Sequence, residues 1–414
     1  MEYEIKDISL KDIGKEKIVW IKDFMPVLSS IEKQFIKEQP LKGIKISMAL
    51  HLEAKTAYLA VVMNNLGAAV RVTGSNPLST QDEITAALVD MGISVFAYRG
   101  VDSMTYKQHL VRALSHKPNI VIDDGADLAY TLHKEHPELM TDVYGGCEET
   151  TTGIVRLKAM DTQKILKYPM FAINDADCKH LFDNRYGTGQ SSLEGIMRAT
   201  NLTLFGKKIV IAGYGWCGKG IASKAKGFGA NVIITEVDTI KALEAAMDGF
   251  EVMPMEQAAS IGDIFITVTG NIDVITDRHF NLMKNNAILC NAGHFDCEIS
   301  MKKLSKIATK QEIRRNGVTG YHLPNGNVIN VLGEGRLVNL ACADGHAAEI
   351  MDMSFSLQLL TALHILKNKD NLQNKLYNVP ACIDKAVADA KLKSMGIRID
   401  ILSDEQKKYL ESWE

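Results

Sequence analysis

Several signatures of membrane, secreted and nucleic-acid-binding proteins are missing from this sequence of 414 residues. No apolar run approaches the ~20 residues that span a bilayer, and the start, MEYEIKDISLKDIGKEK, has no apolar signal core. Lys and Arg number 47 against 50 Asp and Glu, so the net charge of −3 gives no general footprint for nucleic acid or an anionic membrane. We therefore expect neither a nucleic-acid partner nor a membrane partner.

Disulfide and zinc-site spacings are missing as well. Seven cysteines are dispersed along the chain without any C-x-x-C pair, and an odd, scattered set is typical of reduced thiols in the cytosol. We therefore expect a cytoplasmic protein with no metal site. The hydrophobic fraction of 46% is ample for a folded core, and the length favours two or three domains.

Short apolar runs alternate with helical stretches in two separate parts of the chain. Strands that alternate with helices of ten or more residues are typical of parallel, doubly wound sheets. The predicted fold is α/β, with two doubly wound Rossmann-like domains, a cleft between them and a short C-terminal segment. The predicted strands are 43–50, 68–74, 93–98, 119–125, 208–213, 231–236, 263–270 and 286–293.

The order of these stretches suggests domain boundaries. Residues 182–195, FDNRYGTGQSSLEG, are polar and glycine-rich and are interpreted as a hinge, and 318–332 as a hairpin around Pro-Asn-Gly. A long amphipathic helix after residue 347 is expected to cross back to the first unit. The predicted domains are a substrate-binding domain at 1–185 completed by a helix at 347–390, an NAD-binding Rossmann domain at 190–345, and a C-terminal segment at 391–414.

A glycine motif opens the second unit. KIVIAGYGWCGKG (208–220) contains G-x-G-x-x-G at Gly213, Gly215 and Gly218, after a strand and before a helix. Such a turn lets the backbone and a helix N-terminus approach a pyrophosphate. The next strand ends in Glu236, a carboxylate that accepts hydrogen bonds from both ribose hydroxyls and so favours NAD over NADP. The alternative is a glycine turn without any dinucleotide.

The first unit has no such motif and instead carries polar residues at or beyond the carboxyl ends of its strands. His51, Glu53 and Lys55 follow one strand, Gln81 follows another, and Asp124 ends a third. Open α/β sheets bind ligands at this edge, so the substrate is expected in the cleft, facing the nicotinamide.

Taken together, the motifs of this sequence resemble those of a known family. Eight motifs that occur in order along almost the whole chain resemble S-adenosylhomocysteine hydrolase (adenosylhomocysteinase), most closely its short archaeal and thermophile-type branch. They are HLEAKT (51–56), NPLSTQD (76–82), DDGADL (123–128), EETTTG (148–153), NDADCKHLFDNRYG (174–187), GYGWCGKG (213–220), NAGHFD (291–296) and GRLVNL (335–340).

The resemblance implies reversible hydrolysis of S-adenosyl-L-homocysteine to adenosine and L-homocysteine. A tightly held NAD oxidises C3′ of the ribose, which makes the C4′ hydrogen acidic and allows the thiol to leave from C5′. Water then adds, and the hydride returns to C3′, so there is no net redox change. A homotetramer is also implied, as is a place in the methyl cycle of one-carbon metabolism.

The resemblance also assigns roles to residues. Asp124, Lys179 and Asp183 correspond to the groups for proton transfer and the C3′ oxygen, and His51 and His294 to those at the 5′ end. The implied substrate-binding residues are Glu53, Lys55, Thr56, Gln81, Glu149, Phe295 and His346, the last as a gate residue beside Phe295. The implied cofactor-binding residues are Thr150, Thr151, Thr152, Asn184, Gly213, Gly215, Trp216, Cys217, Gly218, Glu236, Asn271, Asn291, Gly293 and Asn339.

Two departures from the family pattern matter. Where relatives usually have Thr and Glu at the purine edge, this chain has Glu53 and Lys55. A lysine donor beside a glutamate acceptor suits hypoxanthine at least as well as adenine, so S-inosyl-L-homocysteine is an alternative substrate. The competing interpretation is that the two side chains pair with each other and leave adenine acceptable. Second, longer relatives continue with a Lys- and Tyr-bearing tail that reaches a neighbouring subunit's NAD site. That tail is absent from this sequence, so weaker or differently completed NAD binding is expected.

Two other functions fit parts of the pattern. An NAD-dependent 2-hydroxyacid dehydrogenase shares the two-lobed layout, but the motifs at 148–153 and 174–187 argue against it. A catalytically silent nucleotide-binding regulator is the other, and the intact Asp124, Lys179 and His294 argue against that.

Overall fold

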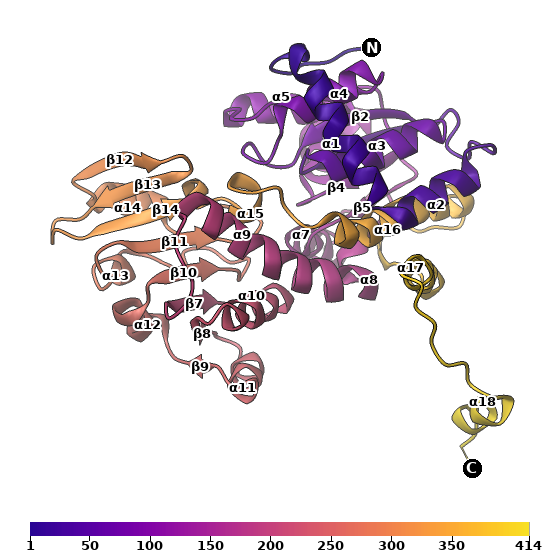
Figure 1. The fold of residues 1–414 in the computed structure, drawn as a ribbon. Helices are drawn as coiled ribbons and strands as arrows, with labels where there is room; N and C mark the ends of the chain where they lie inside the picture. Colours follow the sequence, from indigo (N-terminus) through magenta and orange to yellow (C-terminus); the bar gives the residue numbers. More distant parts are fainter. Residues whose placement is uncertain (414) are drawn as a thin grey trace.

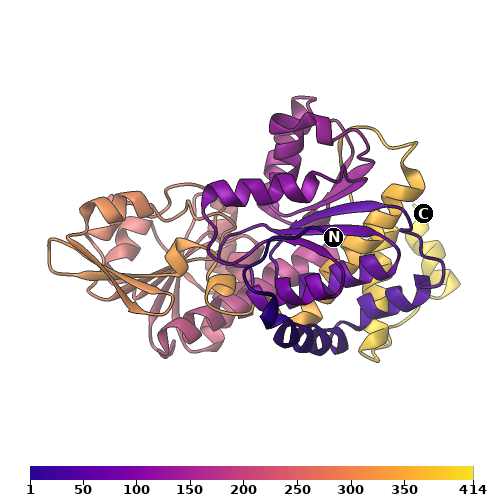
Figure 2. The same cartoon turned by 90° about the horizontal axis from the view of Figure 1, so that it is seen from above.

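The computed structural model describes residues 1–413 as two α/β units joined by helices (Figures 1 and 2). The first unit is built around a seven-stranded parallel sheet of order β15-β6-β5-β4-β1-β2-β3. Its strands are β1 (Lys45–Leu50), β2 (Ala69–Gly74), β3 (Ser94–Phe96), β4 (Ile120–Asp123), β5 (Gly145–Glu148), β6 (Met170–Ala172) and β15 (Leu376–Asn378).

The second unit has an eight-stranded sheet of order β12-β13-β14-β11-β10-β7-β8-β9. It is parallel from β9 to β14, and β12 and β13 extend it antiparallel, with β13 and β14 forming the predicted hairpin. Its strands are β7 (Lys208–Ala212), β8 (Asn231–Thr235), β9 (Glu251–Val252), β10 (Ile264–Thr267), β11 (Ala287–Asn291), β12 (Lys310–Arg315), β13 (Val318–His322) and β14 (Val328–Leu332).

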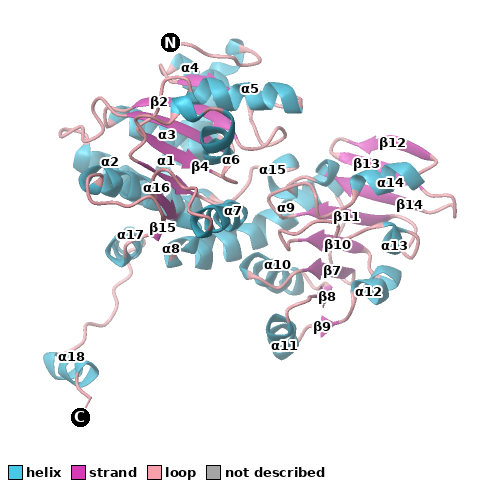
Figure 3. Cartoon of the chain, turned by 180° about the vertical axis from the view of Figure 1, so that it is seen from behind, coloured by secondary structure: helices cyan, strands magenta, loops and turns pink. Residues whose placement is uncertain are grey.

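Helices cover both faces of each sheet (Figure 3), which explains the nearly unbroken apolar strands. Ile46 and Met48 of β1, for example, are fully buried, and every residue of β1 after the first is buried. Neither face of this strand is therefore open to solvent. The helices of the first unit are α1 (Lys11–Asp23), α2 (Pro26–Phe35), α3 (Ala54–Asn65), α4 (Asp82–Asp90), α5 (Ser103–Leu114), α6 (Asp127–Tyr130), α7 (Thr151–Thr162), α8 (Asp177–Lys179), α16 (Ala348–Asn368) and α17 (Ala381–Ser394). Those of the second are α9 (Thr188–Thr200), α10 (Trp216–Gly227), α11 (Thr239–Met247), α12 (Met255–Ile261), α13 (Asp277–Phe280), α14 (Met301–Ile307) and α15 (Val338–Ala341).

The polar, glycine-rich segment between the two units is helical. A π-helix, η5 (His180–Gly187), runs directly into α9, and α9 lies against α10 and α15 of the second unit. Gly189 makes this approach possible, because a Cβ there would lie 2.7 Å from the backbone of Gly220 in α10. Gly189, one of the glycines that suggested a hinge, therefore serves close helix packing.

The chain returns to the first unit through α16, as predicted, and α16 lies against α2, α3 and β5 (Figure 1). The prediction of a single helix over 347–390 is wrong, because α16 ends at Asn368 and α17 starts at Ala381. Between them, β15 pairs with β6 at the sheet edge, with Leu376 opposite Met170. Pro380 directly precedes α17 and favours this new start, since proline suits the beginning of a helix.

Beyond α17 the chain forms an arm that stands apart from both units and carries α18 (Asp404–Glu411) (Figures 1 and 3). No helix among residues 1–413 is long and apolar enough to cross a membrane.

Candidate active site

A cavity of about 1590 Å³ lies between the two units, at the carboxyl ends of their strands. The first unit contributes residues that end or follow β1, β4 and β5, and the second contributes those that follow β7, β8, β10 and β11. This volume exceeds that of ordinary small-ligand pockets, so it has room for a dinucleotide and a nucleoside together.

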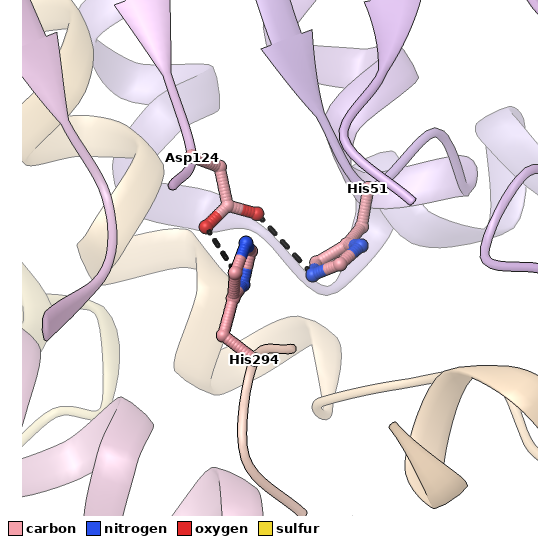
Figure 4. Close-up of side chains that lie close together, drawn as sticks. All are labelled: His51, Asp124 and His294. Atoms are coloured by element: carbon pink, nitrogen blue, oxygen red, sulfur yellow. Dashed lines mark ion pairs between the residues drawn. The ribbon is translucent and has the colours of Figure 1, made fainter. Parts of the chain in front are cut away.

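Asp124 lies between two imidazoles in this cavity (Figure 4). Its Oδ2 is 3.2 Å from His51 Nε2, and its Oδ1 is 3.6 Å from His294 Nδ1. Ser75 donates a hydrogen bond of 3.1 Å to the same Oδ2. The ligand atoms of the three residues lie within 4.8 Å of one another, and they are the only group of this kind among residues 1–413 that a metal ion could bridge.

His51 is held in its neutral form. Burial lowers its pKa to about 4, and the nearby His294 and His346 lower it too, although Asp124 favours the charged form. Its Nδ1 lies 2.9 Å from the Ser79 hydroxyl, so Nε2 is the nitrogen that faces Asp124 and the cavity. A neutral imidazole at pH 7 can accept a proton from water or a thiol.

A second cluster surrounds Lys179, the last residue of α8, which directly precedes η5. Its Nζ lies 3.1 Å from Asp183 Oδ1 and 3.6 Å from Glu149 Oε1, and it donates a hydrogen bond of 2.8 Å to Asn184 Oδ1. The wider turn of a π-helix brings residues four and five positions on to the same lysine, which explains why Asp183 and Asn184 both reach it.

Charges within this cluster are mutually stabilised. Burial alone would favour the neutral amine of Lys179, but Asp183 and Glu149 outweigh it and raise the pKa. Burial likewise opposes ionisation of Asp183, yet Lys179 and His346 hold its pKa well below the ordinary value. Glu149 differs, because burial raises its pKa to about 7 despite the lysine.

The glycine turn fits a dinucleotide. Gly213 has φ of 104°, and a Cβ at Gly218 would lie 2.0 Å from the carbonyl oxygen of Gly213, so strand and helix meet closely there. A Cβ at Gly215 would meet nothing within 4 Å, which leaves the backbone open to a ligand at the start of α10. Glu236, at the end of β8, lines the cavity and accepts hydrogen bonds from the backbone N–H groups of Tyr214 and Val237.

The cavity lining also contains an unsatisfied acceptor. Asn339 is 2% exposed, donates to Ser191 and lines the cavity, and its Oδ1 has no hydrogen-bond partner in the described chain. A buried orphaned carbonyl of this kind suits the amide N–H groups of a nicotinamide. The other predicted cofactor residues that line the cavity are Thr150, Thr151, Thr152, Asn184, Trp216, Cys217, Asn271 and Gly293.

Three predicted site residues do not line the cavity. Gly218 serves the packing just described. Gln81 lies at the N-terminus of α4 and faces Lys17. Asn291 is fully buried and supports the loop behind it, because it binds both the N–H and the C=O of Gly293 and the C=O of Phe295.

The remaining predicted substrate residues line the cavity, in contacts that differ in part from expectation. Lys55 Nζ lies 2.6 Å from Glu53 Oε2 and donates to the carbonyl of Asp344, so the two purine-edge side chains pair with each other. Thr56 is buried beside them. His346 lies 3.0 Å from Asp183, and the ring next to Phe295 is that of His294, so His346 is placed with the catalytic carboxylate.

Sequence reasoning assigned no role to four residues that hold site side chains, although it placed Ser79 among the polar residues at the ligand-binding edge. Ser75 and Ser79 bind His51, and from α16 Ser354 binds Asp183 while Gln358 binds Glu149. Ser354 and Gln358 are four apart and fully buried on a helix that also buries Asp352, Ser356 and Thr361. That spacing of polar residues on a core-facing stripe was the available signal.

The fold and site define an NAD-dependent enzyme with a substrate domain and a Rossmann domain. Family models confirm this class. The NAD-binding domain of S-adenosyl-L-homocysteine hydrolase matches residues 184–345, and the S-adenosyl-L-homocysteine hydrolase model matches residues 2–138. The chain belongs to the S-adenosyl-L-homocysteine hydrolase family, it is a hydrolase, and its cofactor is NAD.

Curated relatives match over nearly their whole length. The chain is 57% identical over 411 residues to the S-inosyl-L-homocysteine hydrolase of Methanocaldococcus jannaschii, covering 99% of each protein. It is 56% identical over 415 residues to the adenosylhomocysteinase of Aquifex aeolicus, covering 100% of this chain and 99% of that protein. The S-inosyl-L-homocysteine hydrolase of Methanopyrus kandleri is 52% identical, with 100% and 98% covered.

Proposed function

We propose that the chain hydrolyses S-adenosyl-L-homocysteine to adenosine and L-homocysteine, and that S-inosyl-L-homocysteine is a second candidate substrate. The observation that carries the proposal is the convergence of Asp124, His51 and His294 on one side of a cavity that also holds Lys179 and the glycine turn. Domains at 1–185 and 190–345, with 391–414 as a C-terminal segment, are the proposed units of binding and cofactor chemistry.

Each residue group has a chemical task. The glycine turn and Glu236 would hold NAD, which would supply the acceptor for the C3′ hydride and return that hydride. Lys179 and Asp183 bind the C3′ oxygen and manage its proton. Asp124 is the carboxylate for the C4′ proton, and His51 and His294, with which it pairs, serve the leaving thiol and the attacking water at C5′.

The second substrate is favoured by the Glu53–Lys55 pair. Hypoxanthine presents an acceptor at C6 and a donor at N1, whereas adenine presents an amino donor and an acceptor. The pair offers an ammonium and a carboxylate side by side, 2.6 Å apart and nearly buried, so it can match either pattern. Relatives named for each of the two thioethers share more than half of the sequence.

The test is thiol release from both thioethers by the purified protein, with the cofactor identified by mass. Catalytic release of homocysteine without accumulating NADH supports the proposal. NADH formed in step with product would instead indicate a dehydrogenase, and no thiol from either compound would refute the proposal.

We also propose a homotetramer in the cytoplasm. The arm after α17 exposes large apolar side chains, including Ile401 at 88% and Trp413 at 92%, which another copy of the chain would cover. All seven cysteines are free thiols, as suits a reducing compartment. Light scattering of the full chain against a Trp413→Ser, Ile401→Ser double variant tests the assembly, which should dissociate at least in part.

A further inference from the structure

Gln358 is a fully buried amide on α16, the helix that returns from the second unit to the first. Its Nε2 donates a hydrogen bond of 2.6 Å to Oε2 of Glu149, which follows β5. Gln358 has no assigned part in the reaction proposed for this site. Its Oε1 has no hydrogen-bond partner among the described residues, so the bond to this cavity carboxylate is all that offsets the free-energy cost of burying the amide.

The two oxygens of Glu149 are in different situations. Oε2 is occupied by Gln358, whereas Oε1 has no hydrogen-bond partner among the described residues and lies 3.6 Å from Lys179 Nζ. An oxygen that is buried, unsatisfied and directed at an ammonium is a ready acceptor for its proton.

Lys179 needs such an acceptor. As a base for the C3′ hydroxyl it must first be neutral, yet Asp183 and Glu149 outweigh burial and raise its pKa. Asp183 is an unsuitable acceptor, because Lys179 and His346 hold its pKa low and Ser354 and His346 already occupy its oxygens.

Resting on the proposed function, we propose that Gln358 is a positioning residue that holds Glu149 with its vacant oxygen toward Lys179, so that Glu149 takes up the lysine proton. One proton passes from Lys179 Nζ to Glu149 Oε1, and the neutral amine then takes the proton of the C3′ hydroxyl. The carboxylate becomes a carboxylic acid, the ammonium is restored, and both protons return when the hydroxyl is re-formed. No electrons move in these steps.

The electrostatic surroundings of Glu149 support this exchange. The charged groups that face it are Lys179, which favours its ionised form, and Asp183 and Asp124, which oppose it, with the Cys147 thiol of β5 also near. Burial is the largest influence and raises the pKa of Glu149 to about 7, whereas the pKa of Asp183 is held low, so Glu149 is the better proton acceptor of the two carboxylates that flank Lys179.

The decisive variant is Gln358→Met, which keeps the volume and removes the hydrogen bond. Without the donor, the pKa of Glu149 rises, so the acid limb of the rate profile should move by about one pH unit to higher pH. At pH 7 the kcat should fall by about tenfold to a hundredfold with little change in KM. A rise in KM with an unchanged kcat and pH profile would mean that Gln358 only helps to grip the ribose, and would overturn the proposal.

Thr361→Val is the matched control. Thr361 lies on the same helix, is fully buried, and its hydroxyl has no hydrogen-bond partner in the described chain. Its pH profile should equal that of the wild type. If Gln358→Met fails to fold, Gln358→Glu preserves size and polarity, and it should move the limb further, because two carboxyls at this distance cannot both ionise.

A measurement without substrate tests this proton transfer separately from the proposed thioether hydrolysis. Infrared pH titration of the carboxylic-acid band, assigned with Glu149→Gln, should place Glu149 near pH 7 in the wild type and higher in Gln358→Met. Titration in the ordinary glutamate range, or no change in the variant, would overturn the proton transfer while leaving thioether hydrolysis intact.

Discussion

His51 and His294 come from opposite units of the chain, yet their ring centroids lie 5.7 Å apart. His51 follows β1 of the first sheet, His294 follows β11 of the second, and Asp124 bridges them (Figure 4). The proton-handling groups are therefore complete only when the two units lie together. A rotation of one unit relative to the other would therefore change the distance between the two imidazole rings, even if neither unit changed internally.

Asp124→Asn should abolish most of the activity. The amide keeps the shape between the imidazoles but cannot accept the C4′ proton, so thiol release should fall by about 10² to 10⁴. NAD content should be unchanged, because the glycine turn is in the other unit. Asp389→Asn, which alters an exposed partner of Lys385 on α17, is the control and should retain wild-type activity. Near-normal thiol release by Asp124→Asn would assign that proton to another group.

The stability of the protein should depend on His51 in acid. Its folded pKa of about 4 lies below the ordinary value of 6.5, so the unfolded chain binds a proton that the folded chain refuses. The His51 contribution is full above pH 6.5 and is lost as the pH falls toward 4, by up to about 3 kcal/mol. Denaturant unfolding of the wild type and His51→Gln at pH 7 and pH 4.5 should show a smaller acid loss in the variant. Equal losses would contradict a neutral His51.

Glu236→Gln should weaken and broaden cofactor binding. The carboxylate at the end of β8 is the acceptor for ribose hydroxyls and repels a 2′-phosphate, and it also accepts from the Tyr214 and Val237 amides. The dissociation constant for NAD should rise about tenfold to a hundredfold, and the preference over NADP should shrink. Glu251→Gln on β9 is the control. Calorimetry with both dinucleotides measures the ratio, and an unchanged ratio would remove Glu236 from cofactor selection.

Local patterns predicted much of the fold because they depend on neighbours in sequence. The buried parallel strands show as apolar runs, and the glycine turn shows as fixed spacing. Strand β15 could not be predicted in this way, because three residues, Leu376–Asn378, are a strand only through pairing with β6 about 200 positions earlier. The π-helical turn at His180–Gly187 could not be predicted either, since its sequence resembles an ordinary helix start.

The site residues likewise divide into those that the local sequence predicts and those that depend on contacts between distant parts of the chain. Residues that end strands, such as Asp124, were predictable because parallel strands bring their carboxyl ends to one edge. Partners supplied by a distant helix were not, and Gln358 meets Glu149 across 209 positions. The pairing of Glu53 with Lys55 was foreseeable as an alternative, but the carbonyl of Asp344 as a further acceptor for Lys55 was not.

The purine preference should follow the Glu53–Lys55 pair. The double variant Glu53→Thr, Lys55→Glu installs the residues usual in this family, so a carboxylate acceptor faces the adenine amino group and the lysine donor that hypoxanthine prefers is gone. The kcat/KM for the adenosine thioether relative to the inosine thioether should rise by about a hundredfold or more, because a site built for one hydrogen-bond pattern rejects the other strongly. Lys391→Gln, which alters another lysine paired with a buried carboxylate, Asp352, is the control and should leave the ratio unchanged. If the double variant folds and its ratio equals that of the wild type, the base is recognised elsewhere in the cavity, and the Asp344 carbonyl that Lys55 now contacts becomes the first place to look.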